Sequence, residues 1–189
     1  MEFVIATHNK HKVEEFSRIL EPLGITIVTA ELTEAEEDGT TFAQNAYIKA
    51  ALACKETGRP AIADDSGLMV DALNGEPGVN TARYAEPGQR KKKVLRLLEN
   101  TPDDKRTAQF VSAICCVFPD GRVLEAEGVC PGTITHECRG EAGFGYDPIF
   151  AVGEKTFAEM TAKEKDDVSH RGIALRKFKE VLQQALEEK

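Results

Sequence analysis

The stretch at residues 61–67 constrains this chain most, because it runs from an apolar strand straight into two adjacent carboxylates. Small and branched apolar residues at 61–63 are typical of a buried strand, and Asp64, Asp65, Ser66 and Gly67 follow directly. Successive side chains of a strand point to opposite faces, so both carboxylates can serve one site only if the strand ends and the chain bends. We expect that bend here, with Gly67 permitting it.

Two interpretations of this stretch are open. A pair of aspartates after a strand is commonly a turn that caps a loop. Carboxylates are also the ligands of Mg²⁺, which takes one or two of them and completes its shell with water and substrate phosphate. The remainder of the chain has to decide between a capped turn and a metal site.

The composition narrows the classes of partner. A chain of 189 residues fits one domain, or two lobes sharing a core. A net charge of −8 argues against binding nucleic acid or an anionic membrane, since both require a basic face. No apolar run is long enough to cross a membrane, and the N-terminus becomes polar too soon for a signal peptide. We expect a cytoplasmic protein that binds any small anion through local cations.

The five cysteines do not indicate a metal centre. Their number is odd and no C-x-x-C spacing occurs, and Cys115 and Cys116 are neighbours that would face opposite sides of a strand. We expect reduced and mostly buried thiols.

The pattern of elements predicts a mixed α/β fold. Strands at 3–6 and 25–28 flank a helix that begins after Asn9 as N-cap, and a second helix begins near Thr40 or Thr41. A helix at 89–99 carries a basic run that is most simply a solvated face. Residues 107–118 and 123–135 form a long β-hairpin, and a last helix occupies about 172–187. We expect two lobes and an elongated, curved central β-sheet flanked by helices.

The turn before the first helix is a candidate phosphate-binding element, and an acidic segment, by composition a solvated loop, precedes the second helix. Thr7, Asn9 and Lys12 lie at a helix start, where free N–H groups and the macrodipole favour an anion, although a simple capped helix is the alternative because P-loop glycines are missing. The acidic segment 31–39 leads into the helix that carries Asn45 and Lys49. Lys49 alone would be an ordinary surface lysine.

Two further segments suit a planar ligand. Residues 140–148 pack three glycines around Phe144, Tyr146 and Asp147, which allows backbone and rings to approach a base, although a bulged strand end has the same composition. His170 and Arg171 follow Ser169 at the start of the last helix, where the dipole disfavours cations. That mismatch indicates an acceptor-rich ligand, with an exposed arginine as the alternative.

Together these clusters match the parts of a nucleoside triphosphate. Carboxylates and Mg²⁺ suit the phosphates and an attacking water, lysines offset charge, and donors with aromatic rings read a base. The clusters are a carboxylate group (Glu36, Glu37, Asp64, Asp65), a cation group (Lys12, Lys49) and a base-sized group (Phe144, Gly145, Tyr146, Asp147, Lys165, His170, Arg171).

The sequence resembles the inosine-triphosphate pyrophosphatase family over nearly its whole length. The resemblance rests on six ordered motifs: Thr7-x-Asn9-x-x-Lys12, Gly39-x-Thr41-Phe42-x-x-Asn45-Ala46-x-x-Lys49-Ala50, Ala63-Asp64-Asp65-Ser66-Gly67-Leu68, Pro77-Gly78-Val79 with Ala82-Arg83-Tyr84, Gly143-Phe144-Gly145-Tyr146-Asp147-Pro148, and Ser169-His170-Arg171. Any one motif would be weak, but six in order make coincidence improbable.

The resemblance implies one domain over 1–189, with two lobes and the active site in the cleft between them. It implies a homodimer and Mg²⁺-dependent hydrolysis of ITP, dITP and XTP to the monophosphate and pyrophosphate, which cleanses the nucleotide pool. On matching positions, Asp65 would be the catalytic base and a metal ligand, and Glu37 the second metal ligand. The implied substrate contacts are Thr7, His8, Asn9, Lys10, His11, Lys12, Ser66, Phe144, Gly145, Tyr146, Asp147, Lys165, His170 and Arg171, with Asn45, Lys49 and Asp64 in support.

The chain departs from the family pattern in four places. His8 stands where glycine is usual, and we expect a tighter phosphate turn or one that uses the imidazole, since histidine tolerates a left-handed backbone better than most residues. Asn80-Thr81 replaces an aromatic-serine pair, the segment after Tyr84 is shorter and more basic, and Cys138 replaces a proline. These changes concern loop geometry and the dimer contact rather than the chemistry.

Two alternatives are retained. A Maf-like nucleotide pyrophosphatase would carry a Ser- and Arg-rich phosphate loop, where this chain has Thr7-His8-Asn9. A nucleotide-binding regulator without catalysis would not need the Asp64-Asp65 pair together with Lys12 and Lys49.

Overall fold

The molecule is built on one seven-stranded mixed sheet with helices on both faces. The computed structural model describes residues 1–187. The strands are β1 (Glu2–Ile5), β2 (Thr26–Val28), β3 (Ala61–Val70), β4 (Thr107–Val117), β5 (Val123–Ile134), β6 (Phe150–Val152) and β7 (Lys155–Thr156). The helices are α1 (Lys10–Leu20), α2 (Phe42–Thr57), α3 (Arg90–Leu97), α4 (Ala162–Val168) and α5 (His170–Glu187).

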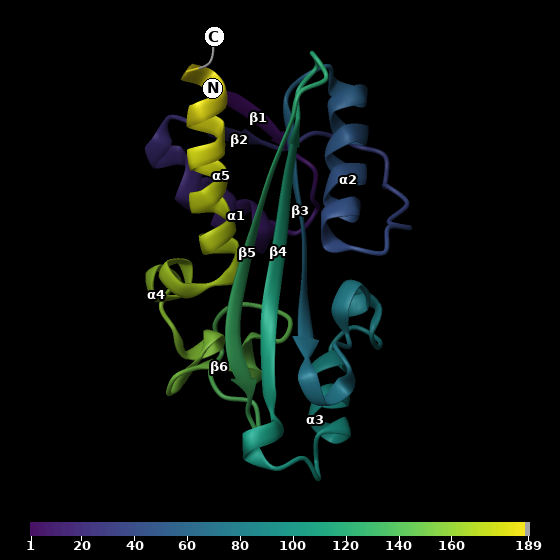
Figure 1. Cartoon of the computed structure of the whole chain (residues 1–189), viewed down its shortest axis with the longest axis vertical. Helices are drawn as coiled ribbons and strands as arrows, with labels where there is room; N and C mark the ends of the chain where they lie inside the picture. Colours follow the sequence, from purple (N-terminus) through teal and green to yellow (C-terminus); the bar gives the residue numbers. More distant parts are fainter. Residues whose placement is uncertain (188–189) are drawn as a thin grey trace.

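The strand order is β2-β1-β3-β4-β5-β6-β7, with β1 parallel to both β2 and β3 and every later pair antiparallel. The long β4–β5 hairpin runs along the length of the molecule, with α1 and α5 on one side of the sheet and α2 on the other (Figure 1). The mixed α/β fold with an elongated sheet, predicted from the sequence, is confirmed.

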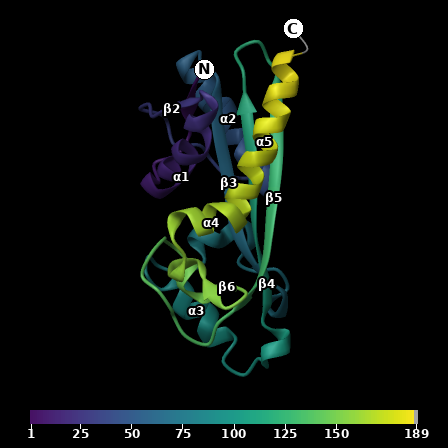
Figure 2. The same ribbon diagram turned by 90° about the vertical axis from the view of Figure 1, so that its left-hand side faces the viewer.

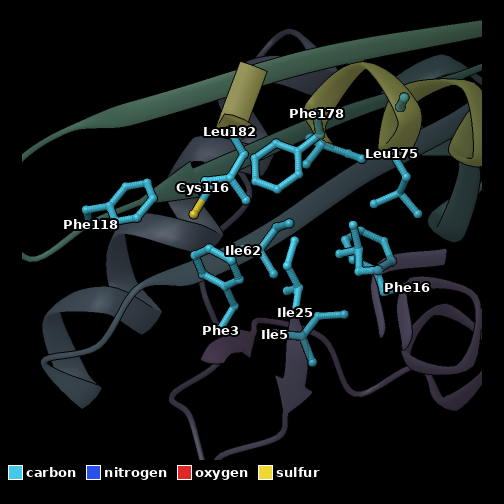
Figure 3. Packing of buried hydrophobic residues seen from close by; sticks show 13 residues of the cluster. Phe3, Ile5, Phe16, Ile25, Ile62, Cys116, Phe118, Leu175, Phe178 and Leu182 are labelled. Atoms are coloured by element: carbon cyan, nitrogen blue, oxygen red, sulfur yellow. The ribbon is translucent and has the colours of Figure 1, made fainter. Parts of the chain in front are cut away.

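The two faces of the sheet are packed differently. On one face α1 and α5 cover large residues, among them Phe3, Ile62 and Phe178 (Figure 3). On the other face α2 presents Ala46 and Ala50, whose small side chains bring the helix close to the sheet. A third cluster, which includes Leu68, Val94, Phe110, Phe150 and Phe157, lies at the end of the molecule that carries α3 and β6 (Figure 2).

Local sequence signals place the helix starts as predicted. Asn9 is the N-cap of α1 and accepts a hydrogen bond from His11 N at 3.0 Å. Thr41 caps α2 in the same way, accepting from Gln44 N. Ser169 Oγ accepts from Gly172 N at 3.1 Å at the start of α5. Each cap supplies an acceptor for an N–H group that has no partner within the helix.

The predicted bend after residue 63 is wrong. β3 continues without interruption through Asp64 and Asp65 to Val70, because β4 supplies ladder partners along its full length. The pleat therefore puts the two carboxylates on opposite faces of the sheet. Gly67 is small for another reason: a Cβ at this position would lie 2.5 Å from Gly78 O.

The cysteines agree with the expectation of free and mostly buried thiols. All five cysteines are free, and all but Cys138 are buried. Cys116 packs in the core under α1 and α5 whereas Cys115 packs under α2, so the neighbours do face opposite ways. Within residues 1–187, none of the helices combines the length and the apolar character that a membrane span requires.

Candidate active site

Asp65 lies on the α2 face of the sheet, beside a lysine and a second carboxylate. Lys49 Nζ is 3.4 Å from Asp65 Oδ1 and 3.3 Å from Glu37 Oε2, so one ammonium lies between two acids. Asn45, one turn earlier on α2, is buried and its Oδ1 accepts from Gly39 N at 2.9 Å. Asn45 thus fixes the loop that carries Glu37.

The electrostatics of Asp65 suit a group that accepts a proton. Burial raises the pKa of Asp65, and the nearby carboxylates of Glu37 and Asp64 add to the rise, against the opposing effect of Lys49 and Lys12. Burial lowers the pKa of Lys49, but the surrounding carboxylates outweigh this effect and the pKa is raised. Asp65 Oδ2 is buried and has no hydrogen-bond partner among the described residues.

Asp64 lies on the opposite face and is held by two cations. Lys12 Nζ is 3.0 Å from Asp64 Oδ1, and Arg171 donates to Asp64 Oδ2 from Nε at 3.2 Å and from Nη2 at 3.1 Å. Ser66 also donates to this carboxylate. Burial raises the pKa of Asp64, but Lys12 and Arg171 overcome that effect and hold it far below its usual range. Asp64 is therefore a permanent anion that supports its neighbours.

Glu15 belongs to this charged network although no motif predicted it. It is buried on α1, where it accepts from Arg171 Nη1 and, at 2.8 Å, from Lys165 Nζ. Lys165 Nζ also lies 2.8 Å from Asp147 Oδ2. The signal available in the sequence was the i, i+3 spacing from Lys12, which places Glu15 on the same side of the helix.

A cavity of about 510 Å³ brings most of the predicted residues together. It is lined by the predicted residues Thr7, His8, Asn9, His11, Lys12, Glu37, Lys49, Asp65, Ser66, Phe144, Gly145, Tyr146, Asp147, Lys165, His170 and Arg171. Four predicted residues do not line it: Lys10 and Glu36 are exposed, whereas Asn45 and Asp64 are buried.

Two arginines that were given no role also line this cavity. Arg83 was part of a family motif, and Arg90 opens the basic run that was interpreted as a solvated face. That interpretation is wrong for Arg90, and also for Lys93, whose Nζ donates to Tyr84 O at 2.8 Å and lies 3.9 Å from the Tyr84 ring centroid. A run of basic residues in the sequence does not indicate which of its side chains face the protein rather than solvent.

The start of α1 forms one wall of the cavity. Thr7 Oγ1 accepts from Asn9 N at 3.1 Å, which shapes the turn before the helix. His8 does not need a left-handed backbone, since Asn74 is the one non-glycine residue with positive φ in the described chain. Burial lowers the pKa of Lys12, and Arg171 and Lys49 lower it further against the opposing effect of Asp64.

The loop with Phe144 forms another wall of the cavity, which adjoins α1, and is held by internal hydrogen bonds. Gly143 has φ +71°, and a Cβ there would lie 2.0 Å from Asp147 Oδ2. That oxygen accepts from Phe144 N at 3.0 Å, and the buried Tyr146 hydroxyl donates to Thr81 O at 2.8 Å. The Phe144 ring stacks on His11 with centroids 5.1 Å apart. A flat aromatic surface is therefore available in the cavity.

The side chains of His170 and Arg171 at the start of α5 are accommodated within the protein itself. Arg171 donates four hydrogen bonds, to Asp64, Glu15 and Ser66, from all three nitrogens of its guanidinium. The mismatch with the helix dipole is thus explained by buried carboxylates and does not require a ligand. Burial holds the pKa of His170 well below 6.5, and its ring stacks on Phe110 with centroids 4.6 Å apart. His170 is neutral at pH 7.

The donor set fits a hard divalent cation that shares its ligands with phosphate. Within residues 1–187, no three His, Cys, Asp or Glu side chains come together as a complete metal cage. Glu37 and Asp65 supply two carboxylates at one cavity wall, and the unpartnered Asp65 Oδ2 is available as a ligand. Mg²⁺ is bound in this way, by one or two carboxylates plus substrate phosphates.

The fold and the cavity define an α/β protein with a site for an anionic ligand that has an aromatic part. The model of the Ham1 family matches residues 3–181. A dITP/XTP pyrophosphatase from Desulforamulus reducens is 50% identical over 192 aligned positions, which cover 96% of each chain. A HAM1 protein structure from Coxiella burnetii has a TM-score of 0.87 and 42% identity, covering 97% of this chain and 99% of that one. The Staphylococcus aureus Ham1 structure has a TM-score of 0.86 and 38% identity, with 98% and 100% coverage.

The chain therefore belongs to the Ham1 family. The prediction of an inosine-triphosphate pyrophosphatase-like family from six motifs is confirmed, and the Maf-like alternative is set aside.

Proposed function

We propose that this protein hydrolyses non-standard purine nucleoside triphosphates, namely ITP, dITP and XTP, to the monophosphate and pyrophosphate, and so cleanses the nucleotide pool. The observation that carries the proposal is a single cavity lined by Glu37, Lys49 and Asp65 and also by Phe144. Relatives that cover almost the whole chain are named dITP/XTP pyrophosphatases, which supports the same substrates.

The proposed chemistry uses Asp65 as the general base. Asp65 accepts a proton from water while the water oxygen bonds to the α-phosphorus, and the bond from that phosphorus to the oxygen of the leaving pyrophosphate breaks. Burial raises the pKa of Asp65, which makes its carboxylate a stronger base. Lys12 and Lys49 offset the negative charge that develops on the phosphates.

Glu37 and Asp65 are the residues that would hold Mg²⁺. When bound, Mg²⁺ neutralises and polarises the phosphates. Lys49 contacts both carboxylates, so it also holds them side by side.

Base selection is proposed to depend on donors at the start of α5. Hypoxanthine and xanthine carry a 6-keto acceptor where adenine carries an amino donor, so a donor in the site pairs with the first two and is left unpaired by adenine. Arg171 retains at least one N–H group for this role, and the neighbouring His170 also lines the cavity.

A panel of ITP, XTP, dITP, GTP and ATP with Mg²⁺, with products resolved by chromatography, tests the proposal. We expect monophosphate and pyrophosphate from the first three. Release of orthophosphate would contradict the bond assignment, and binding of ITP without hydrolysis would indicate the non-catalytic regulator instead.

The homodimer, the cytoplasmic location and a single two-lobed domain with the cleft as its site are part of the same proposal. Light scattering of the purified chain distinguishes a dimer from a monomer.

A further inference from the structure

Two buried polar atoms, one on β4 and one at the start of α5, have no hydrogen-bond partner among the described residues. Ser112 Oγ and His170 Nδ1 are both enclosed, and neither is within hydrogen-bonding distance of a described residue. Ser112 is 0% exposed and His170 is 4% exposed. Buried polar groups are hydrogen-bonded in the great majority of cases, so this pair requires an explanation.

The register of the sheet places the two side chains together. On β4, Ser112 pairs with Ser66 on one side and Gly128 on the other, so its side chain points to the α5 face. A Cβ on Gly128 would lie 2.1 Å from His170 O. Phe110, two residues before Ser112 and on the same face, stacks against the His170 ring at 12°. His170 therefore lies on the sheet between Gly128, the cross-strand partner of Ser112, and Phe110, on the face to which Ser112 also points.

We propose that the Ser112 hydroxyl is joined to His170 Nδ1 through one bridging water molecule, which accepts from the hydroxyl and donates to Nδ1, and so holds His170 as the tautomer that carries its proton on Nε2. A hydroxyl has one donor and two acceptor sites, and a neutral imidazole has one of each. If Nδ1 donated to the water and the water to Ser112, the hydroxyl hydrogen would be left unpaired. If Ser112 donates, only acceptor capacity is unused, which proteins tolerate better.

This tautomer gives His170 a defined function, which rests on the proposed hydrolysis of 6-keto purine nucleotides. His170 lines the cavity, and with Nδ1 enclosed it is Nε2 that a ligand can reach. An Nε2–H group donates to a 6-keto oxygen and cannot accept from a 6-amino group. Ser112 is thus a positioning residue for base selection, acting through His170 without touching the substrate.

The tautomer can be read without an activity measurement. The chain has four histidines, so the full-length protein labelled with ¹⁵N-histidine gives few signals, and His170→Gln identifies those of His170. At pH 7 we expect wild-type His170 with an unprotonated, hydrogen-bonded Nδ1 and a protonated Nε2. A protonated Nδ1 in the wild-type protein would overturn the proposal.

Ser112→Ala tests the coupling to selectivity. We expect the Nδ1 resonance of His170 to shift, and the ratio of kcat/KM for ITP over ATP to fall roughly two- to tenfold, the value of one neutral hydrogen bond. Cys116→Ala is the control, because Cys116 is a buried residue of similar size four positions along the same face of β4. It should leave both quantities unchanged.

An unchanged Nδ1 resonance or an unchanged ratio in Ser112→Ala would contradict the proposal. If the wild-type protein hydrolysed none of these nucleotides, the proposed function would fail, while the spectra would still decide the tautomer.

Discussion

At the scale of single residues, the two adjacent aspartates show how the pleat of a strand separates roles. Asp64 faces Lys12 and Arg171 and has a lowered pKa, whereas Asp65 faces Lys49 and Glu37 and has a raised pKa. Burial raises the pKa of both carboxyl groups. At Asp64 the cations Lys12 and Arg171 outweigh this effect, whereas at Asp65 the carboxylates of Glu37 and Asp64 add to it. The sequence indicated that the two were unequal, but not that they lie on opposite faces.

This contrast predicts opposite phenotypes for isosteric substitutions. Asp65→Asn should lower kcat by about 10²- to 10⁴-fold, because the proton acceptor is lost. It should change the free energy of unfolding little, because Lys49 keeps Glu37 as a counter-charge. Asp64→Asn should lower the free energy of unfolding by about 3 kcal/mol, because Lys12 and Arg171 lose a buried counter-charge. Urea unfolding and ITP hydrolysis measure both. Equal loss of stability in the two variants would contradict the assignment.

His170 predicts a pH dependence of stability. Its pKa is well below 6.5 in the folded protein, through burial first and then Arg171 and Lys165, with Asp64 opposing. As the pH falls through 6.5, His170 is therefore protonated in the unfolded chain but stays neutral in the folded protein. The free energy of unfolding should fall between pH 7 and pH 5 by up to about 1.4 kcal/mol per pH unit. His170→Phe should remove this component, and parallel pH profiles for the two proteins would contradict it.

At the scale of elements, the sequence predicted the helices and strands that contain a local signal, such as a helix cap or a long apolar stretch. Caps at Asn9 and Thr41 marked helix starts, and two long apolar stretches marked the β4–β5 hairpin. β6 and β7 have three and two residues, too few for a period to show. α4 was missed although Thr161 and Glu164 form a capping box before it. β3 continues through Asp64 and Asp65 because it pairs with β4, and a local sequence pattern does not indicate such pairing.

The approach of α5 to the sheet gives an element-scale prediction. Gly128→Ala adds a methyl group 2.1 Å from His170 O and 2.5 Å from Ala174 N, both backbone atoms of α5. The helix must move, so we expect a loss of about 1–3 kcal/mol in the free energy of unfolding. Activity towards ITP should also fall, because His170 and Arg171 lie in the first turn of α5. Val129→Ala, at the neighbouring exposed position, is the control and should change neither quantity.

At the scale of the whole molecule, the cavity joins segments that are distant in the chain. Its lining runs from Ala6 to Arg171, and buried ion pairs link α1 to α4 and α5. Most of the predicted site residues line this one cavity, as expected from the sequence. Glu15 and Arg90 were missed because their roles depend on which side chains lie opposite, which is a property of the assembled fold.

The assembled site predicts that metal removal separates activity from stability. Lys49 lies between Glu37 and Asp65, so the protein offsets these carboxylates with its own charge and needs no cation there to fold. Chelation with EDTA should therefore abolish hydrolysis of ITP while the thermal midpoint of the nucleotide-free protein stays unchanged. Added Mg²⁺ should restore activity, whereas added Na⁺ at matched ionic strength should not. A midpoint that falls on chelation would mean that a metal ion contributes to folding, as it does in structural sites that bind only the folded state.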